Sequence, residues 1–312
     1  MLPGEFDVIA RHFRPLAGPG SLGLSDDAAV FAPPPGRELV VAVDAIVAGV
    51  HFLPDDAPDL VARKLLRVNL SDLAAMAAAP LGYLVTLSAP KGTGDEWFAG
   101  FAAGLRADQD TFGIMLLGGD TTSTPGPLSL SLTVLGHVAR GQALRRAGAR
   151  PGDGIWVTGT IGDGALGLLA LRGHVADPGG FLAGRYRLPE PRLGLPLHGV
   201  ASAGMDVSDG LVQDLGHLCR AAGIGATVEA GAVPLSAAAR MAGPAWLPTC
   251  LVGGDDYELL LAVPLGREDT LRKAAGTVPM TRIGTFRHQP GVDVLGLDGR
   301  LLDLPSGGWS HF

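Results

Sequence analysis

The sequence predicts an α/β protein made of two layered domains. The chain has 312 residues, which is long enough for two domains of ordinary size. It is 47% apolar and contains 47 glycines and 24 prolines, a composition typical of a globular fold with many tight turns. Short apolar strands alternate with segments of helical spacing instead of following one another as hairpins. This alternation indicates helices layered against sheets.

The first half of the chain contains alternating predicted helices and strands. We expect a short helix over 5–14, and the apolar run 39–43 predicts a buried strand that ends at Asp44. Apolar residues at helical spacing predict a long helix over 58–78, which carries Asp72. Further strands are expected at 81–87, 114–117 and 128–134, and a further helix at 95–108. The strict alternation of 128–134 predicts one packed and one polar face.

The pattern changes around 145–153, where charge, glycine and proline predominate, and we place a domain boundary there. The expected domains are residues 1–147 and 148–312. In the second domain the predicted strands are 155–158, 204–207, 226–229, 257–263 and 280–286, and the predicted helices are 164–172 and 210–222. This arrangement predicts a C-terminal sheet flanked by helices.

The composition excludes several classes of protein. The 31 acidic and 24 basic residues give a formal charge of −7, which argues against nucleic acid as a partner. Only three residues are lysine, and none is followed by serine or threonine, which excludes a phosphate-binding loop of the P-loop type. The sequence contains no zinc-type spacing of cysteine and histidine and no G-x-S-x-G motif of serine hydrolases.

The sequence also bears on the compartment. The first residues lack a basic segment followed by an apolar one, so we expect no secretory signal. No apolar run approaches the roughly 18 residues of a membrane span. Cys219 and Cys250 could pair, but two buried thiols in a reducing compartment are the favoured alternative. We therefore predict a cytoplasmic protein with no membrane partner.

Aspartates next to glycine or other small residues mark the predicted ends of several strands. They are Asp26, Asp27, Asp44, Asp120, Asp206, Asp209, Asp255 and Asp256. Ligands bind at strand ends in open α/β sheets, and carboxylates that meet there repel one another unless they share protons or bind cations. Hard oxygen ligands of this kind favour Mg²⁺. The alternative for any single Asp-Gly pair is a helix cap or a turn.

Other features give weaker signals. Gly18–Gly23 and Gly162–Gly167 both fit G-x-G-x-x-G. The first has no preceding strand, and the second is not followed by a second strand that ends in an acid, so neither indicates a dinucleotide site. His51 lies just beyond Asp44 and is either a ligand contact or a packed residue. Arg146, at the domain boundary, is either a phosphate clamp or a solvated linker residue.

A series of motifs occurs in one order along the chain. They are Gly4–Phe6, Ser25–Ala29, Asp44 with Gly49–Phe52, Val68–Met76, Gly118–Thr121, Arg146 with Gly148-Ala149 and Pro151–Asp153, Val157–Gly159, Asp206–Leu211 and Gly253–Leu259. Together they resemble the thiamine-monophosphate kinase family, and the resemblance extends from residue 4 to Trp309–Phe312. The related aminoimidazole ribonucleotide synthetase and selenophosphate synthetase share the aspartates and the fold, but not both Asn69–Met76 and Asp256–Leu259.

The resemblance implies an ATP-dependent kinase that converts thiamine monophosphate to thiamine diphosphate. It implies a homodimer in which the N-terminal domains, which bind ATP and Mg²⁺, pair through their sheets. The implied ligands of several Mg²⁺ ions are Asp27, Asp44, Asp72, Asp120, Asp206 and Asp209. The implied ATP contacts are Gly119, Asp120, Arg146 and Ser208, and the implied contacts to thiamine phosphate are His51, Asp255 and Trp309. We assign no general base, because the acceptor phosphate is already ionised at neutral pH.

Three positions depart from the family pattern. Ser25 replaces a glycine, Ala42-Val43 replaces a pair of hydroxyl residues before Asp44, and Asp255 replaces a glutamate. Two other functions remain open on the same scaffold. One is another ATP-using enzyme of the superfamily, similar to aminoimidazole ribonucleotide synthetase, and the other is a non-catalytic regulator that binds Mg²⁺ and nucleotide.

Overall fold

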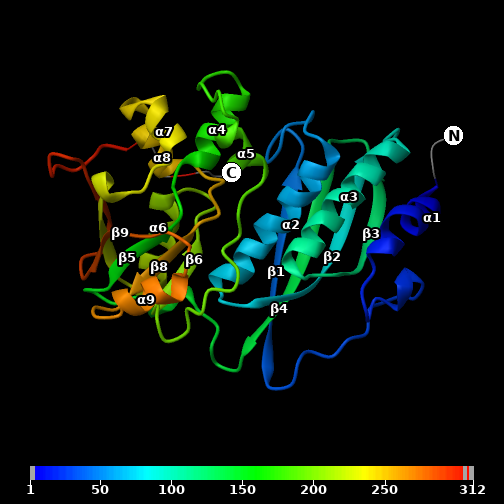
Figure 1. Cartoon of the computed structure of the whole chain (residues 1–312), viewed down its shortest axis with the longest axis horizontal. Coiled ribbons are helices and arrows are strands. Elements are labelled where there is room, and N and C mark those ends of the chain that lie inside the picture. The colour runs from blue at the N-terminus through cyan, green and yellow to red at the C-terminus, as the bar shows by residue number, and fades with distance from the viewer. Residues whose placement is uncertain (1–3, 305–307, 309–312) are drawn as a thin grey trace. The chain divides into compact units, whose positions relative to one another are not determined.

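The chain forms two compact units in the computed structural model, which describes residues 4–304 and 308 (Figure 1). Unit 1 comprises Met1–Leu73 and Ala78–Gly141, and unit 2 comprises Ala74–Ala77 and Gln142–Phe312. The predicted boundary, after residue 147, lies a few residues further along the chain than this division. The predicted α/β class with two layered domains is confirmed.

Unit 1 contains a four-stranded sheet, two long helices and an irregular amino-terminal segment. The strands are β1 (Arg37–Val47), β2 (Ala79–Pro90), β3 (Leu116–Thr124) and β4 (Ser129–Ala139), and the long helices are α2 (Pro58–Ala75) and α3 (Asp95–Phe112). The helix predicted over 5–14 is divided into α1 (Glu5–Val8), a π-helical turn (Ile9–Phe13) and a 3-10 turn (Arg14–Leu16), and another 3-10 turn follows at Leu22–Leu24. Pro15 lacks the N–H that would continue a regular helix.

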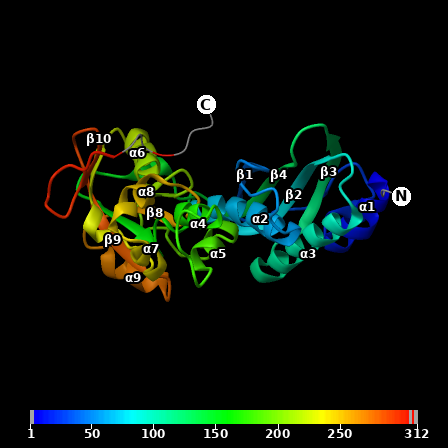
Figure 2. The ribbon, with the colours of Figure 1, turned by 90° about the horizontal axis from the view of Figure 1, so that it is seen from above.

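The sheet of unit 1 has the strand order β1-β4-β2-β3, with β2 and β3 parallel and the other pairs antiparallel. Helices α2 and α3 lie on one face of this sheet (Figure 2). The alternation predicted for β4 is confirmed, because Leu130, Leu132 and Val134 are fully buried and the residues between them are half-buried.

Strand β1 differs from the buried strand that we predicted. It is an edge strand, and Val41 and Val43 are 60% and 61% exposed. An apolar run alone does not distinguish a buried strand from one with an open outer face. Asp44 and Asp120 also lie inside β1 and β3 and not at strand ends. Both strands are edges of the sheet, but Asp120 pairs with the exposed Thr86 on the open face, whereas Asp44 pairs with the fully buried Leu132 on the covered face.

Unit 2 contains a six-stranded sheet with the order β10-β7-β9-β5-β8-β6. Its strands are β5 (Gly154–Thr158), β6 (Ala203–Asp206), β7 (Gly225–Glu229), β8 (Leu259–Val263), β9 (Met280–Arg287) and β10 (Gly291–Leu295). Its helices are α4 (Asp163–Leu171), α5 (Phe181–Arg187), α6 (Leu211–Ala222), α7 (Ala237–Ala242), α8 (Leu247–Val252) and α9 (Glu268–Ala275), with 3-10 turns at Arg146–Gly148, Ala230–Ala232 and Pro244–Trp246.

The core of unit 2 follows from its central strands. Every residue of β5 and β8 is buried, as expected for near-continuous apolar strands covered on both faces.

The predicted strands and helices of this half are confirmed to within a few residues. The sequence pattern missed α5, α7, α8, α9 and β10, all of eight residues or fewer, because short elements carry little periodicity. None of the helices in the described part of the chain is both long and apolar enough to cross a bilayer.

Candidate functional site

Unit 1 contains a cavity of about 610 Å³ that brings several predicted site residues together. The loop Asp26-Asp27 lines it together with Gly118–Thr121 of β3 and the neighbouring residues of β2. Predicted residues Asp27, Gly119 and Asp120 therefore belong to one site. The volume lies in the range of pockets that bind small molecules and cofactors.

Residue 119 must be glycine for β3 to pair with β2 as it does. In the parallel register Val85 lies opposite Gly119, and Thr86 lies opposite Asp120. A Cβ atom on Gly119 would lie 1.9 Å from the carbonyl oxygen of Val85. The glycine thus lets β3 approach closely and present Asp120 to the cavity.

The charged residues that line this cavity are all acidic. Three carboxylates line it, those of Asp26, Asp27 and Asp120, and none of its lining residues is basic. Asp27 and Asp120 are exposed, so their carboxylates face water or a ligand. Oxygen donors without a basic partner fit divalent cations such as Mg²⁺.

Asp44 and Asp72 lie elsewhere in unit 1. Asp44 is on β1, opposite the fully buried Leu132, and its backbone N–H donates to Oδ1 of Asn69 on α2 at 3.1 Å. Asp72 follows Asn69 by three residues and so lies on the same face of α2. Asp44 and Asp120 occupy the two edge strands of the sheet, three strand spacings or about 14 Å apart.

His51 lies in the turn that follows β1. Its Nδ1 accepts the backbone N–H of Val47 at 3.1 Å, and its carbonyl oxygen accepts Nζ of Lys64 at 2.8 Å. These bonds fix the turn against α2. His51 therefore has a packing role in this structure, and its contact with substrate stays a prediction.

In unit 2 the loop 206–210 carries Asp206, Ser208 and Asp209. The carboxylate of Asp214, on the first turn of α6, accepts the backbone N–H groups of Ser208 and Asp209 at 3.0 Å and of Gly210 at 3.2 Å. Burial raises the pKa of Asp214 to about 7, the hydrogen bond from Asp209 lowers it, and the charges of Asp209 and Asp206 raise it. Asp214 thus holds the loop in a fixed shape.

Asp255 is joined to this loop through the backbone. Its N–H donates to the carbonyl oxygen of Ser208 at 2.9 Å, and the N–H of Tyr257 donates to that of Val207 at 2.8 Å. Asp255 and Tyr257 have φ values of 70° and 53°, in the left-handed region. Such conformations in residues other than glycine cost of order 1–3 kcal/mol each and cluster at functional sites.

Arg146 lies beside the same loop. It is exposed on the 3-10 turn Arg146–Gly148, and the neighbouring Arg145 accepts the N–H of Gly204 on β6 at 3.2 Å. The pKa of His217 on α6 is lowered by burial, then by the charges of Arg220 and Arg146. Four of the predicted residues of unit 2 therefore share a loop or face it, together with Asp255.

The six predicted metal ligands are divided between the units. Asp27, Asp44, Asp72 and Asp120 belong to unit 1, and Asp206 and Asp209 belong to unit 2. Across residues 4–304 and 308, the structure has no group of three or more His, Cys, Asp or Glu side chains arranged to hold one metal ion. Trp309 lies outside the described residues.

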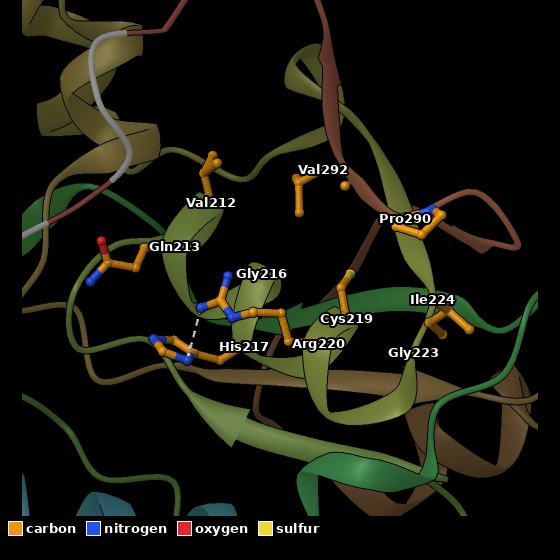
Figure 3. A pocket seen from close by; sticks show the side chains of 11 residues that line it. Val212, Gln213, Gly216, His217, Cys219, Arg220, Gly223, Ile224, Pro290 and Val292 are labelled. Carbon is orange, nitrogen blue, oxygen red and sulfur yellow. Dashed lines mark hydrogen bonds between the residues drawn. The ribbon is translucent and has the colours of Figure 1, made fainter.

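A second cavity, of about 640 Å³, lies along α6 in unit 2 (Figure 3). Gln213, His217 and Arg220 line one side of it, and Nη2 of Arg220 lies 3.0 Å from Nδ1 of His217. None of the predicted site residues lines this cavity.

The glycine-rich turn before α4 binds a carboxylate of the chain itself. The N–H groups of Gly162 and Gly164 donate to Asp256 at 2.7 and 3.0 Å. These are the groups that a dinucleotide phosphate would use in a G-x-G-x-x-G site. The structure therefore supports the sequence argument against such a site.

Comparisons with known proteins agree over nearly the whole chain. The family models for AIR synthase related proteins match residues 25–138 with the N-terminal domain and 150–295 with the C-terminal domain. Thiamine-monophosphate kinase of Caulobacter vibrioides is 46% identical over 99% of this chain and 91% of that protein. The chain belongs to the thiamine-monophosphate kinase family. It is therefore an enzyme of the kinase class.

Solved structures of this kinase family have the same fold. Thiamine-monophosphate kinase from Stenotrophomonas maltophilia K279a superposes with a TM-score of 0.85 at 41% identity, covering 97% of this chain and 99% of that one. AaThiL complexed with AMPPCP and TMP superposes with a TM-score of 0.78 at 29% identity, covering 99% and 97%.

The structure accounts for two of the three departures from the kinase family pattern. Ser25 has φ of −120°, which needs no glycine, and its Oγ donates to the carbonyl oxygen of Leu22 at 2.7 Å. Aspartate tolerates the left-handed backbone at position 255 better than most residues do. Nothing in the structure explains Ala42 and Val43.

Sequence reasoning missed residues that shape the site without being ligands. Asp214 and Asn69 each fix a predicted ligand through the backbone. The signal for Asp214 is an acid in the first turn of a helix that follows a glycine. Asn69 was noted as part of the motif Asn69–Met76, but its contact with Asp44 was not predicted, because that partner is 25 residues away in the sequence.

Proposed function

We propose that the chain catalyses the ATP-dependent phosphorylation of thiamine monophosphate to thiamine diphosphate. The observation that carries this proposal is its similarity, over 99% of its length, to AaThiL complexed with AMPPCP and TMP. AMPPCP stands in for ATP in that complex, so both proposed substrates have a counterpart there. We assign parts in this reaction to residues of the acidic cavity of unit 1 and to residues of the loop 206–210 of unit 2.

The main physical obstacle to the reaction is repulsion between phosphates. The acceptor is largely dianionic at neutral pH, so it needs no general base. Two unit charges 4 Å apart repel by about 4 kcal/mol at an effective dielectric constant of 20. None of the residues that line the acidic cavity of unit 1 is basic, so positive charge there would come from ions in solution. Several bound Mg²⁺ ions would supply it by screening the phosphates and orienting them.

The residues of this chain take defined parts in the proposal. Asp27, Asp44, Asp72, Asp120, Asp206 and Asp209 bind the ions, and Gly119, Asp120, Arg146 and Ser208 contact ATP. His51, Asp255 and Trp309 contact thiamine monophosphate. An oxygen of the acceptor phosphate attacks the γ-phosphorus in line, the bond to the bridging oxygen breaks, and ADP leaves. No phosphoenzyme forms, so radiolabelled ATP should leave no label on the protein.

The proposal includes a homodimer formed through the sheets of unit 1. The open side of this sheet presents exposed apolar side chains, with Leu39 at 45%, Val41 at 60%, Val43 at 61% and Leu84 at 38%. A contiguous apolar surface of this kind is typical of an interaction site. In sedimentation experiments we expect a dimer for the wild type and a monomer for Val41→Lys. A monomeric wild type would contradict the proposal.

The decisive experiment incubates the purified chain with ATP, Mg²⁺ and thiamine monophosphate and measures thiamine diphosphate, with a chelator as control. We expect product only when free Mg²⁺ is present. Product from a different acceptor would favour the enzyme similar to aminoimidazole ribonucleotide synthetase. Tight binding of Mg-ATP with no product from any acceptor would favour the regulator.

The cytoplasmic location stays a prediction, and the free, buried state of Cys219 and Cys250 agrees with it.

A further inference from the structure

The segment 255–258 alternates half-buried and fully buried side chains. Asp256 and Glu258 are 1% and 0% exposed, whereas Asp255 and Tyr257 are half-buried. The two half-buried residues are also the two with left-handed backbone. Residues held in this conformation persist only where their surroundings impose it. The two buried acids, Asp256 between them and Glu258 after them, are therefore the candidates for that constraint.

Glu258 has the strongest anchorage of any residue in this segment. Its carboxylate accepts Nε and Nη2 of Arg192 at 2.6 and 2.5 Å, Nη2 of Arg185 at 3.0 Å, and Oγ1 of Thr158 at 2.6 Å. The pair with Arg192 is bidentate, a geometry that fixes both partners. Gly159 leaves just enough room, because a Cβ there would lie 2.1 Å from Oε1 of Glu258.

Arg185 extends this anchorage to the neighbouring residue. The same Nη2 that binds Glu258 also donates to the carbonyl oxygen of Asp256 at 3.2 Å. The side chain of Asp256 is in turn held by the turn before α4. Asp255 thus lies next to a residue whose backbone and side chain are both fixed.

We infer that Glu258, held by Arg185 and Arg192, is a positioning residue that fixes Asp255 for binding the phosphorylated acceptor. The inference rests on the role proposed for Asp255, but the restraint itself is a property of this chain. Loss of the Glu258 charge leaves the two arginines with the exposed Glu190 as their remaining shared carboxylate, 3.0 Å from Arg192 and 3.8 Å from Arg185, so their hold on this segment should weaken. The backbone of Asp255 loses its restraint as a consequence.

The test compares Glu258→Gln with Glu190→Gln. Glu190 also binds Arg192, at 3.0 Å, but its side chain is 63% exposed, so it is a matched loss of charge at the edge of the same network. For Glu258→Gln we expect the KM for thiamine monophosphate to rise at least tenfold and the KM for ATP to change less than threefold. For Glu190→Gln both values should stay within twofold. An unchanged KM for thiamine monophosphate in Glu258→Gln would overturn the inference.

A double variant separates positioning from a general structural role. If Glu258 acts through Asp255, then Glu258→Gln adds less than a twofold change in KM when Asp255→Ala is already present. An equally large effect in that background would show that Glu258 acts by another route. If Glu258→Gln does not fold, Arg192→Lys keeps the charge and loses the bidentate geometry. A folded Arg192→Lys with the wild-type KM would overturn the inference.

Hydrogen exchange gives a readout that does not depend on activity. The amides of Asp255 and Tyr257 should exchange at least tenfold faster in Glu258→Gln than in Glu190→Gln. Unchanged exchange would refute the restraint even if the kinase assay succeeds. Faster exchange in a chain that does not phosphorylate thiamine monophosphate would uphold the restraint and refute the proposed function instead.

Discussion

Replacing Asp120 by asparagine tests the acidic cavity of unit 1 most directly. Asp120→Asn keeps the size of the side chain and removes its negative charge. The residue is exposed on an edge strand, so its loss should leave the core intact. We therefore expect a large kinetic effect and almost no effect on stability.

The expected size follows from the exposure of the carboxylate. A unit charge 4 Å from another interacts by about 1 kcal/mol in water and about 4 kcal/mol at an effective dielectric constant of 20. For a divalent ion these limits double to about 2 and about 8 kcal/mol. Because Asp120 is exposed, the lower limit applies most closely. It corresponds to a fall in kcat/KM of about 30-fold.

The assay measures thiamine diphosphate formation at saturating Mg²⁺, and thermal unfolding is followed in parallel. Asp110→Asn is the matched control, because Asp110 is an exposed aspartate of α3 in the same unit. Both variants should unfold within about 0.5 kcal/mol of the wild type. A rate within threefold of the wild type for Asp120→Asn would refute the ligand role. A large loss of stability would show that Asp120 is structural.

Three further predictions concern unit 2. Burial raises the pKa of Asp256, so below about pH 4 its contribution to stability is complete, and it is lost as the pH rises through the raised value. Asparagine does not ionise, so the melting temperature of Asp256→Asn minus that of the wild type should increase between pH 5 and pH 8. A difference in melting temperature that does not depend on pH would contradict this. Thr158→Val removes a buried donor to Glu258 and the acceptor of the Leu259 N–H, so the free energy of unfolding should fall by about 2–4 kcal/mol. Thr270→Val, at an exposed threonine, should lower it by less than about 0.5 kcal/mol. Burial raises the pKa of Cys250 to about 12 and that of Cys219 to about 11. Neither thiol should therefore react with a disulfide reagent at pH 8 until the protein is denatured. Rapid reaction in the native state would refute their burial.

The fold was most predictable where burial imposes a simple period. Alternation in β4 and helical spacing in α2 follow from one buried face, so both elements were placed to within a few residues. The same reasoning failed for β1, because Val41 and Val43 are apolar yet exposed on an open face. The apolar run correctly predicted a strand there, but whether its side chains are buried depends on which elements cover that face of the sheet.

Sequence reasoning predicted candidate site residues but not the groups that hold them. Asp206, Ser208, Asp209 and Asp255 stay predictions, and the structure joins the loops that carry them through the backbone. Asp214 binds its loop from a helix turn only a few residues further along the chain, whereas Glu258 binds partners at distances in sequence that no local pattern encodes. For Glu258 the partner Arg192 is 66 residues away. Such long-range pairs arise only when strands and helices have been assembled.

The position of Asp44 and Asp120 shows why the face and the strand matter as much as the residue. Both are aspartates on strands of one sheet, and from the sequence both are candidate ligands of several Mg²⁺ ions. In the structure they occupy opposite edge strands, about 14 Å apart along the sheet. Carboxylate oxygens bind Mg²⁺ at about 2.1 Å. If both residues bind Mg²⁺ as proposed, then within one chain Asp44 and Asp120 bind different ions, because one ion cannot reach both strands.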